Sequence, residues 1–97
     1  MSGARGYSFE WDERKNAANG RKHGVSFHEA TSVFADPLSI LIEDARHSLE
    51  EPRFIVMGLS AAGRLLVVAF TERGPHTRLI TAREATPRER RQYEQAS

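Results

Sequence analysis

Two segments in the C-terminal half of the chain place an arginine two residues after a threonine, a pattern suited to anion binding. Thr71 and Arg73 close one apolar run, and Thr81 and Arg83 close the next. An arginine guanidinium can bind phosphate or carboxylate through two parallel hydrogen bonds. The spacing therefore predicts phosphate chemistry, provided that both pairs reach the same face of a sheet.

The alternation of side chains along a β-strand indicates which face each arginine takes. The first run has its bulkier residues at Leu66, Val68 and Phe70, which suit a core. We therefore expect Thr71 and Arg73 on the opposite face. In the second run the same rule separates two sets of residues, Ile80 and Ala82 on one face and Leu79, Thr81 and Arg83 on the other.

Three further side chains could take part in the same chemistry. Lys22 and His23 precede Gly24 at a predicted helix end. His23 is either a partner for the helix dipole or a group that takes and gives protons near neutral pH. Tyr93 either packs the last helix onto the core or stacks on a base.

Other kinds of site lack support in the sequence. The four histidines are scattered, no two have the His-x-x-x-His spacing, and cysteine is absent. Neither a Gly-rich phosphate loop nor a Ser nucleophile elbow occurs. We therefore expect no metal and no cofactor.

Charge is divided unevenly along the 97 residues. Residues 1–52 contain 6 Lys and Arg against 9 Asp and Glu, whereas residues 53–97 contain 8 against 4, and all eight are arginine. This bias indicates either a solvated face with ordinary ion pairs or an anion-binding surface. No apolar run is long enough for a membrane span or a signal peptide, so a cytosolic protein without membrane contact is expected.

Capping signals and alternation divide the chain into elements. Asp12, Ser26 and Thr86 can each cap a helix that follows, and Gly24 suits the left-handed end of the first one. Strands are predicted at 7–11, 39–43, 53–59 and 64–73, and after the turn at Gly74 and Pro75. The order is strand, two helices, a four-stranded meander and a helix. It predicts an α+β fold with helices on one face of a largely antiparallel sheet.

Sequence blocks along roughly residues 8–95 resemble the BrnT family of bacterial toxins. The blocks are Phe9-Glu10-Trp11-Asp12, Asn19, Lys22-His23-Gly24-Val25-Ser26-Phe27, Glu29-Ala30, Phe34-x-Asp36-Pro37, Gly58-Leu59-Ser60, Gly63-Arg64-Leu65-Leu66-Val67-Val68, Thr71-x-Arg73, Arg78-Leu79-Ile80-Thr81-Ala82-Arg83, Ala85 and Glu89-Arg90-x-x-Tyr93. The resemblance implies a RelE-like fold, in the order β-α-α, antiparallel meander and C-terminal helix. The length of the chain predicts a single domain over residues 1–97, and the small, polar composition of residues 1–6 predicts that they are disordered.

The same resemblance implies an activity and partners. It implies a metal-independent endoribonuclease that blocks translation. Such a toxin is neutralised by a BrnA-type antitoxin with a ribbon-helix-helix part, and the complex represses its own operon through operator DNA. The site residues that it implies are Arg83, Arg73, Lys22, His23 and Tyr93 for catalysis, with Arg64 and Arg78 as outer phosphate contacts.

A mechanistic hypothesis follows for these residues. Arg73 and Arg83 clamp the phosphate, Lys22 or His23 handles protons, and Tyr93 stacks or orients a base. Two other functions remain open. One is a catalytically inactive, toxin-like module that only binds an antitoxin or RNA and supports repression. The other is a general RNA-binding domain on the arginine-rich half.

Overall fold

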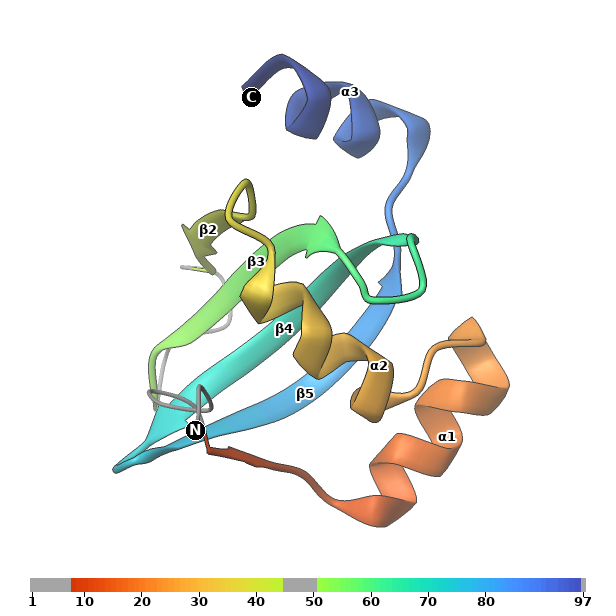
Figure 1. The fold of residues 1–97 in the computed structure, drawn as a ribbon. Helices are drawn as coiled ribbons and strands as arrows, with labels where there is room; N and C mark the ends of the chain where they lie inside the picture. The colour runs from red at the N-terminus through yellow and green to blue at the C-terminus, as the bar shows by residue number, and fades with distance from the viewer. Residues whose placement is uncertain (1–7, 45–50, 97) are drawn as a thin grey trace.

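A computed structural model describes residues 8–44 and 51–96 as a mixed α+β fold (Figure 1). The elements in chain order are β1 (Phe9–Glu10), α1 (Glu13–His23), α2 (Phe27–Thr31), η1 (a 3₁₀ helix, Ser32–Ala35), β2 (Ile40–Glu43), β3 (Arg53–Leu59), β4 (Leu65–Arg73), β5 (His76–Glu84) and α3 (Pro87–Ala96). The predicted second strand thus begins at Ile40, one residue later than expected. The predictions for Tyr7 and for residues 1–6 lie outside the described residues.

The five strands form one sheet in the order β1-β5-β4-β3-β2. The strands from β2 to β5 pair as an antiparallel meander, and β1 pairs in parallel with β5. The short β1 covers only Thr77 and Arg78 of β5. The rest of that edge of β5 is therefore open to α1, which lies beside it in Figure 1.

The ends of α1 follow the capping chemistry of the sequence. The Asp12 carboxylate accepts hydrogen bonds from the backbone N–H groups of Arg14 at 2.8 Å and Lys15 at 3.3 Å. Gly24 ends the helix with a φ of 70°, a conformation that glycine adopts without a Cβ clash. These two caps fix where α1 starts and stops, and hence where Lys22 and His23 lie.

The N-terminal caps of α3 and α2 differ in one respect. Thr86 and Glu89 form a reciprocal capping box at the start of α3. The Thr86 N–H donates to the Glu89 carboxylate at 2.9 Å, and the Glu89 N–H donates to the Thr86 hydroxyl at 3.1 Å. Ser26 accepts from the Glu29 N–H at 3.0 Å, as predicted for α2. The Glu29 carboxylate does not return to Ser26, however, because it binds Arg64 instead.

The core lies between one face of the sheet and the α2–η1 segment. From that segment Phe27, Ala30 and Val33 are fully buried, and they pack on the even residues of β4. Leu66, Val68 and Phe70 were expected on this face, and the structure confirms it. Thr71 and Arg73 therefore lie on the opposite face.

The helices do not all cover the same face, so that part of the prediction is wrong. Tyr93 of α3 belongs to a second apolar cluster with Met57, Leu65 and Val67, which point away from α2. A short helix can bury only one stripe of side chains. Tyr93 is the buried residue of α3, and it packs this helix against the second face of the sheet.

A β-bulge in β5 changes the predicted alternation. Ala69 pairs with Thr81 and Phe70 with Leu79, which leaves Ile80 without an opposite residue. Leu79 therefore joins Ala82 in the core instead of sharing a face with Thr81 and Arg83. The prediction for Leu79 is wrong, because a regular strand was assumed.

In the described part of the chain, no helix is both long enough and apolar enough to cross a bilayer.

Gly58 and Gly20 give opposite predictions for the same substitution. A Cβ on Gly58 would lie 3.0 Å from both Asp36 Oδ2 and Ser39 Cβ. Gly58→Ala should therefore lower the free energy of unfolding by about 1–3 kcal/mol. Gly20 lies inside α1, and apart from its chain neighbours and its own helix backbone no described atom lies within 4 Å of such a Cβ. Gly20→Ala should therefore raise the free energy of unfolding by about 0.5–1 kcal/mol. Urea unfolding measures both, and equal stabilities of the two variants would contradict the packing at Gly58.

Candidate functional site

A row of polar residues crosses three strands on the sheet face that α2 leaves open. Thr71 pairs with Arg53 on one side and with Arg78 on the other, and Arg73 lies two residues further along β4. Side chains directly opposite each other in a sheet are about 5 Å apart. The four residues line a small hollow of about 110 Å³, here called the arginine hollow, which Lys15 of α1 also lines.

A second and larger hollow runs between α1 and the open edge of β5. It has a volume of about 280 Å³ and is here called the α1 cleft. Its lining residues are Lys15, Ala18, Asn19, Lys22, His23, Ile80 and Thr81. Lys15 and Ile80 line both hollows, so the two adjoin and form one groove.

The helical period brings the cations of α1 to this groove. Lys15, Ala18, Asn19 and Lys22 follow the spacing that places residues on one face of a helix. At 1.5 Å per residue, Lys15 and Lys22 are roughly 10 Å apart along the axis. The groove wall therefore carries a cation at each end, with His23 beside the second.

The buried Asn19 amide fixes α1 against the strand. Its Nδ2 group donates to the carbonyl of Val25 at 2.9 Å and to that of Ala82 at 2.7 Å, and its Oδ1 accepts from the Ala82 N–H at 3.1 Å. The side chain thus bonds to β5 much as a neighbouring strand would. This contact sets the width of the α1 cleft.

Cations outnumber carboxylates in the described lining of the groove. Five cations line the two hollows, Lys15, Lys22, Arg53, Arg73 and Arg78, against the carboxylates Asp12 and Glu51. Arg73 pairs with Glu51 at 3.2 Å and Arg78 with Glu10 at 3.1 Å. Both distances are long for charge-assisted bonds, and the Arg73 pair is exposed, so these pairs are weak.

Lys22 and His23 differ from these arginines in having no partner. Among residues 8–44 and 51–96, no group forms a hydrogen bond or an ion pair with either side chain. Both line the α1 cleft. A ligand that enters the cleft would therefore meet a lysine and a histidine side chain that no described group binds.

Arg83 lies on the same sheet face as Arg73 but at the other end. Arg83 is opposite Val67, whereas Arg73 is opposite His76, since β4 and β5 are antiparallel. Six residues of β4 separate the two positions, which is roughly 20 Å. The hypothesis that Arg73 and Arg83 clamp one phosphate is therefore wrong, because two side chains cannot span that distance to a single group.

Arg83 already forms an ion pair with a carboxylate. Its Nη1 and Nη2 atoms bond to the two oxygens of Glu89 at 2.8 and 2.9 Å. The hydrogen bond with Arg83 lowers the pKa of Glu89 to about 2, and the same bond raises the pKa of Arg83. An anion that binds Arg83 must compete with Glu89.

Arg64 is a structural residue, which corrects its prediction as an outer phosphate contact. Its guanidinium bonds to Glu29 at 2.6 and 3.1 Å, to Glu84 at 2.9 Å and to the Gly24 carbonyl at 3.0 Å. The hydrogen bond between Arg64 and Glu29 raises the pKa of the arginine and lowers that of the carboxyl. Arg64 thus joins the α1–α2 connection to β4 and β5.

Tyr93 is also structural, and its prediction as a base-stacking residue is wrong. Its side chain is 7% exposed and packs in the second cluster. Its hydroxyl donates to Asp36 Oδ2 at 2.6 Å, and this bond raises the pKa of Tyr93 to about 12. A buried ring with a committed hydroxyl cannot stack on a ligand.

Lys15 and Arg53 were not predicted from the sequence. Lys15 lies seven residues before Lys22, so its place on the same helix face could have been found from the helical period. Arg53 begins β3, and its alignment with Thr71 depends on strand register, which the sequence does not contain.

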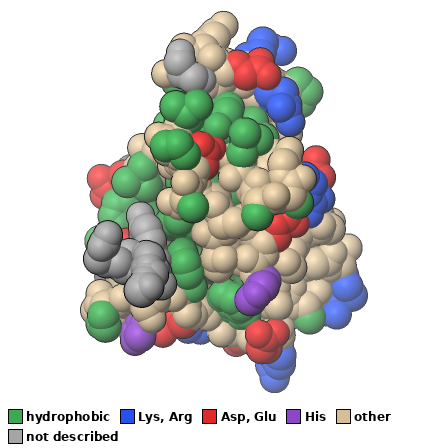
Figure 2. Space-filling view, viewed as in Figure 1, with side chains coloured by type: hydrophobic (Ala, Val, Ile, Leu, Met, Phe, Trp, Pro, Cys, Tyr) green, Lys and Arg blue, Asp and Glu red, His purple; other side chains and the backbone are tan. Residues whose placement is uncertain are grey.

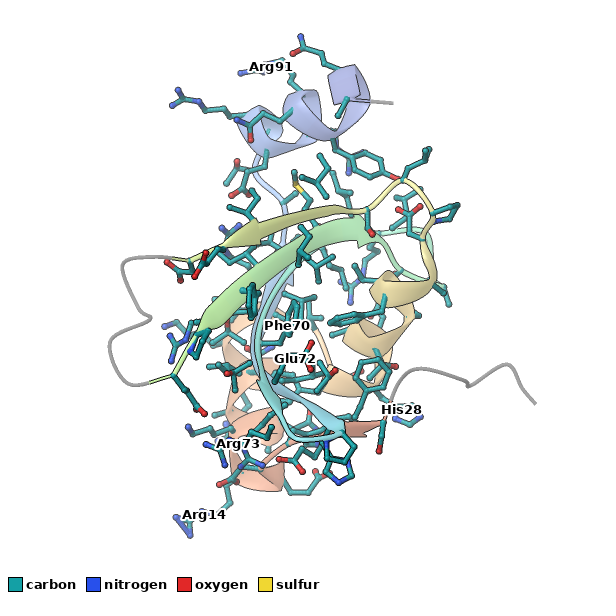
Figure 3. The ribbon with its side chains drawn as sticks, turned by 90° about the vertical axis from the view of Figure 1, so that its left-hand side faces the viewer. Arg14, His28, Phe70, Glu72, Arg73 and Arg91 are labelled. Atoms are coloured by element: carbon teal, nitrogen blue, oxygen red, sulfur yellow. The ribbon has the colours of Figure 1, made fainter. Side chains whose placement is uncertain are left out.

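Figure 2 looks onto the α2 side, where Lys and Arg side chains lie round the rim instead of at the centre. In Figure 3, Arg73 lies beside α1 at one end of the molecule, and Arg91 projects from α3 at the other. Among the described residues, no three His, Asp or Glu side chains are grouped so that they could hold a metal ion.

The fold and the groove define a class before any comparison: a small α+β protein with a cationic surface groove suited to an anionic chain. Comparison then identifies the family. Residues 11–89 match the family described as "Ribonuclease toxin, BrnT, of type II toxin-antitoxin system", so the chain belongs to the BrnT family, as its sequence blocks indicated.

A solved structure has the same fold. The 1.1 Å crystal structure of the Brucella abortus ribonuclease toxin BrnT superposes with a TM-score of 0.64 at 20% identity, covering 82% of this chain and 97% of that chain. No curated protein matches this sequence. The structural likeness supports the fold, whereas the family match supports a ribonuclease toxin of a toxin–antitoxin system.

Proposed function

We propose that this protein is a metal-independent endoribonuclease, and that its RNA substrate lies in the groove between α1 and β5. The observation that carries the proposal is the set of cations along this groove, where Lys22 and His23 have no partner among residues 8–44 and 51–96. Single-stranded nucleic acid binds in cationic grooves that follow its backbone. Because cations dominate the lining, it attracts phosphate and repels a divalent cation.

Cleavage of RNA by its own 2′-hydroxyl needs three kinds of group. A base removes the 2′-OH proton, and the 2′ oxygen attacks the adjacent phosphorus. The bond to the 5′ oxygen breaks, and an acid protonates that oxygen, which leaves a 2′,3′-cyclic phosphate and a 5′-hydroxyl. Cations stabilise the charge that builds up on the phosphorane. Lys22 and His23 can supply the proton transfers and part of the charge.

The arginines take separate roles in this proposal. Arg73 and Arg78, with Arg53 and Lys15, hold a phosphate that flanks the cleaved one. Arg83 lines neither hollow but lies two residues beyond Thr81 on the same face, roughly 7 Å along β5, where it contacts the RNA backbone past the α1 cleft. The RNA therefore extends along the groove instead of being held at one point.

The biological setting is proposed from family membership. In this setting the enzyme has a RelE-like fold and acts in the cytoplasm. It halts translation by cutting RNA and is neutralised by a BrnA-like ribbon-helix-helix antitoxin. The complex binds operator DNA through the antitoxin and represses its own operon. The competing function is an inactive toxin-like module, which would keep the antitoxin contact and lose the chemistry.

The test is cleavage of end-labelled RNA by the purified protein in the presence of excess EDTA. We expect fragments with 2′,3′-cyclic phosphate and 5′-hydroxyl ends, together with growth arrest when the protein is expressed without an antitoxin. Folded protein that leaves RNA intact and growth unaffected would support the inactive module. Cleavage that EDTA abolishes and a divalent cation restores would contradict the metal-independent mechanism.

A further inference from the structure

The two adjoining hollows differ in chemistry although they share Lys15 and Ile80. The arginine hollow has a mainly polar lining with three arginines and Thr71. The α1 cleft has a mainly apolar lining. Ala18 and Ile80 contribute carbon only, and lysine side chains commonly lay their aliphatic stems along such a surface. A nucleotide has the same two-part character, with a charged phosphate and a flat, largely apolar base.

The sizes of the hollows match these two parts. The arginine hollow, at about 110 Å³, has room for a group of phosphate size. The α1 cleft, at about 280 Å³, lies just below the range of about 300–1,000 Å³ that is usual for drug-sized ligands. It therefore suits a single ring system.

The bulge explains why the cleft has an apolar floor. Ile80 has no opposite residue on β4, so its side chain is not part of a cross-strand pair. It lines the groove instead, next to Ala18 of α1. The polar groups left to meet a ligand here are His23, Thr81 and the two lysines at the ends of the wall, since the Asn19 amide is already bonded to Val25 and Ala82.

We propose that the α1 cleft is a nucleobase subsite, which receives the base of a nucleotide whose phosphate occupies the arginine hollow. This inference rests on the proposed function and deepens it. The base leaves water by covering Ala18 and Ile80, and its edge meets Thr81 and His23. No described Phe, Tyr or Trp lines the cleft, so apolar contact and hydrogen bonds to the base edge hold the base, and these bonds discriminate among bases.

The test compares ligands with and without a base. The probes are the four 2′-deoxynucleoside 3′,5′-bisphosphates and the abasic tetrahydrofuran 3′,5′-bisphosphate. Each competes with a labelled single-stranded RNA made uncleavable by 2′-O-methylation. We expect the wild type to bind at least one base-containing probe about tenfold more tightly than the abasic probe, as for one well-packed base.

Two neighbouring alanines of α1 provide a matched pair of variants. Ala17 and Ala18 are both exposed, and only Ala18 lines the cleft. Leucine is a good helix former, so either substitution leaves α1 intact. Ala18→Leu should fill the cleft and abolish the preference for a base, whereas Ala17→Leu should keep it.

The outcomes separate the subsite from the function. Equal affinity of the wild type for the base-containing and abasic probes overturns the subsite, and so does a preference that survives in Ala18→Leu. In both cases, binding of the labelled RNA leaves the proposed function in place. If the wild type does not bind the labelled RNA at all, the RNA groove itself is refuted.

Discussion

Replacement of His23 by alanine should reduce the rate of RNA cleavage by about 10²–10⁴-fold, the usual contribution of a general acid or base. His23 lines the α1 cleft and has no partner among the described residues, so its ring is available to RNA. Histidine is also the side chain best suited to exchange protons near neutral pH. The measurement is single-turnover cleavage of labelled RNA.

His28 supplies the control for this variant. It is exposed at the start of α2, packs beside Trp11 with ring centroids 6.2 Å apart, and lines neither hollow. His28→Ala should cleave RNA at the wild-type rate. Wild-type cleavage by a folded His23→Ala protein would remove His23 from the mechanism and leave Lys22 as the proton-transfer group.

The second large effect concerns the attachment of α1. Asn19→Asp should lower the free energy of unfolding by about 3 kcal/mol or more. The carboxylate has nearly the shape of the amide but cannot donate to the carbonyls of Val25 and Ala82, and each buried acceptor left unsatisfied costs about 1–3 kcal/mol. Burial next to carbonyls raises the pKa of such a carboxyl. The deficit should therefore be largest above that raised pKa, shrink as the pH falls from there to the pKa of the unfolded chain, and stay at its smallest below that value.

Asn16→Asp is the matched control, one helical turn earlier. The Asn16 Oδ1 atom accepts from the Phe27 N–H at 2.8 Å, and an aspartate keeps that bond. Among the described residues, the amide donates only to the exposed Glu13 carboxylate, at 3.2 Å. Replacing this bond by a like-charge pair on a helix surface costs a few tenths of a kcal/mol. Urea unfolding of both variants measures the difference. Similar losses in the free energy of unfolding would show that the Asn19 hydrogen bonds do not contribute more to stability than those of Asn16.

Local chemistry was predictable because its causes lie within a few residues. The caps at Asp12, Ser26, Gly24 and Thr86 follow from side chains next to the helix ends, and the structure has all four. The alternation of β4 was also predicted correctly, since its pairing with β3 is regular from Leu65 to Thr71. Lys22 and His23 were placed correctly at a helix end, where both line the groove.

Features that depend on distant partners could not be predicted in this way. The bulge at Ile80 arises from pairing between β4 and β5, so strict alternation along β5 predicted the wrong face for Leu79. Arg64 looked like a phosphate contact because Glu29, 35 residues earlier, is not a neighbour in sequence. Tyr93 is buried because α3 packs on the second face of the sheet, where the Tyr93 hydroxyl bonds to Asp36. In each case the missing information was the register or the packing of elements far apart in the chain.

The unpaired position of Ile80 has a consequence for how this protein can evolve. Most strand residues are constrained twice, by the hydrogen-bond ladder and by the side chain opposite. Ile80 has no opposite residue, and a mutation there leaves Leu79 and Thr81 on the faces they already occupy. Selection on the ligand can therefore act on this position almost independently of selection on folding, so related proteins can diverge at the floor of the groove while they keep the same sheet.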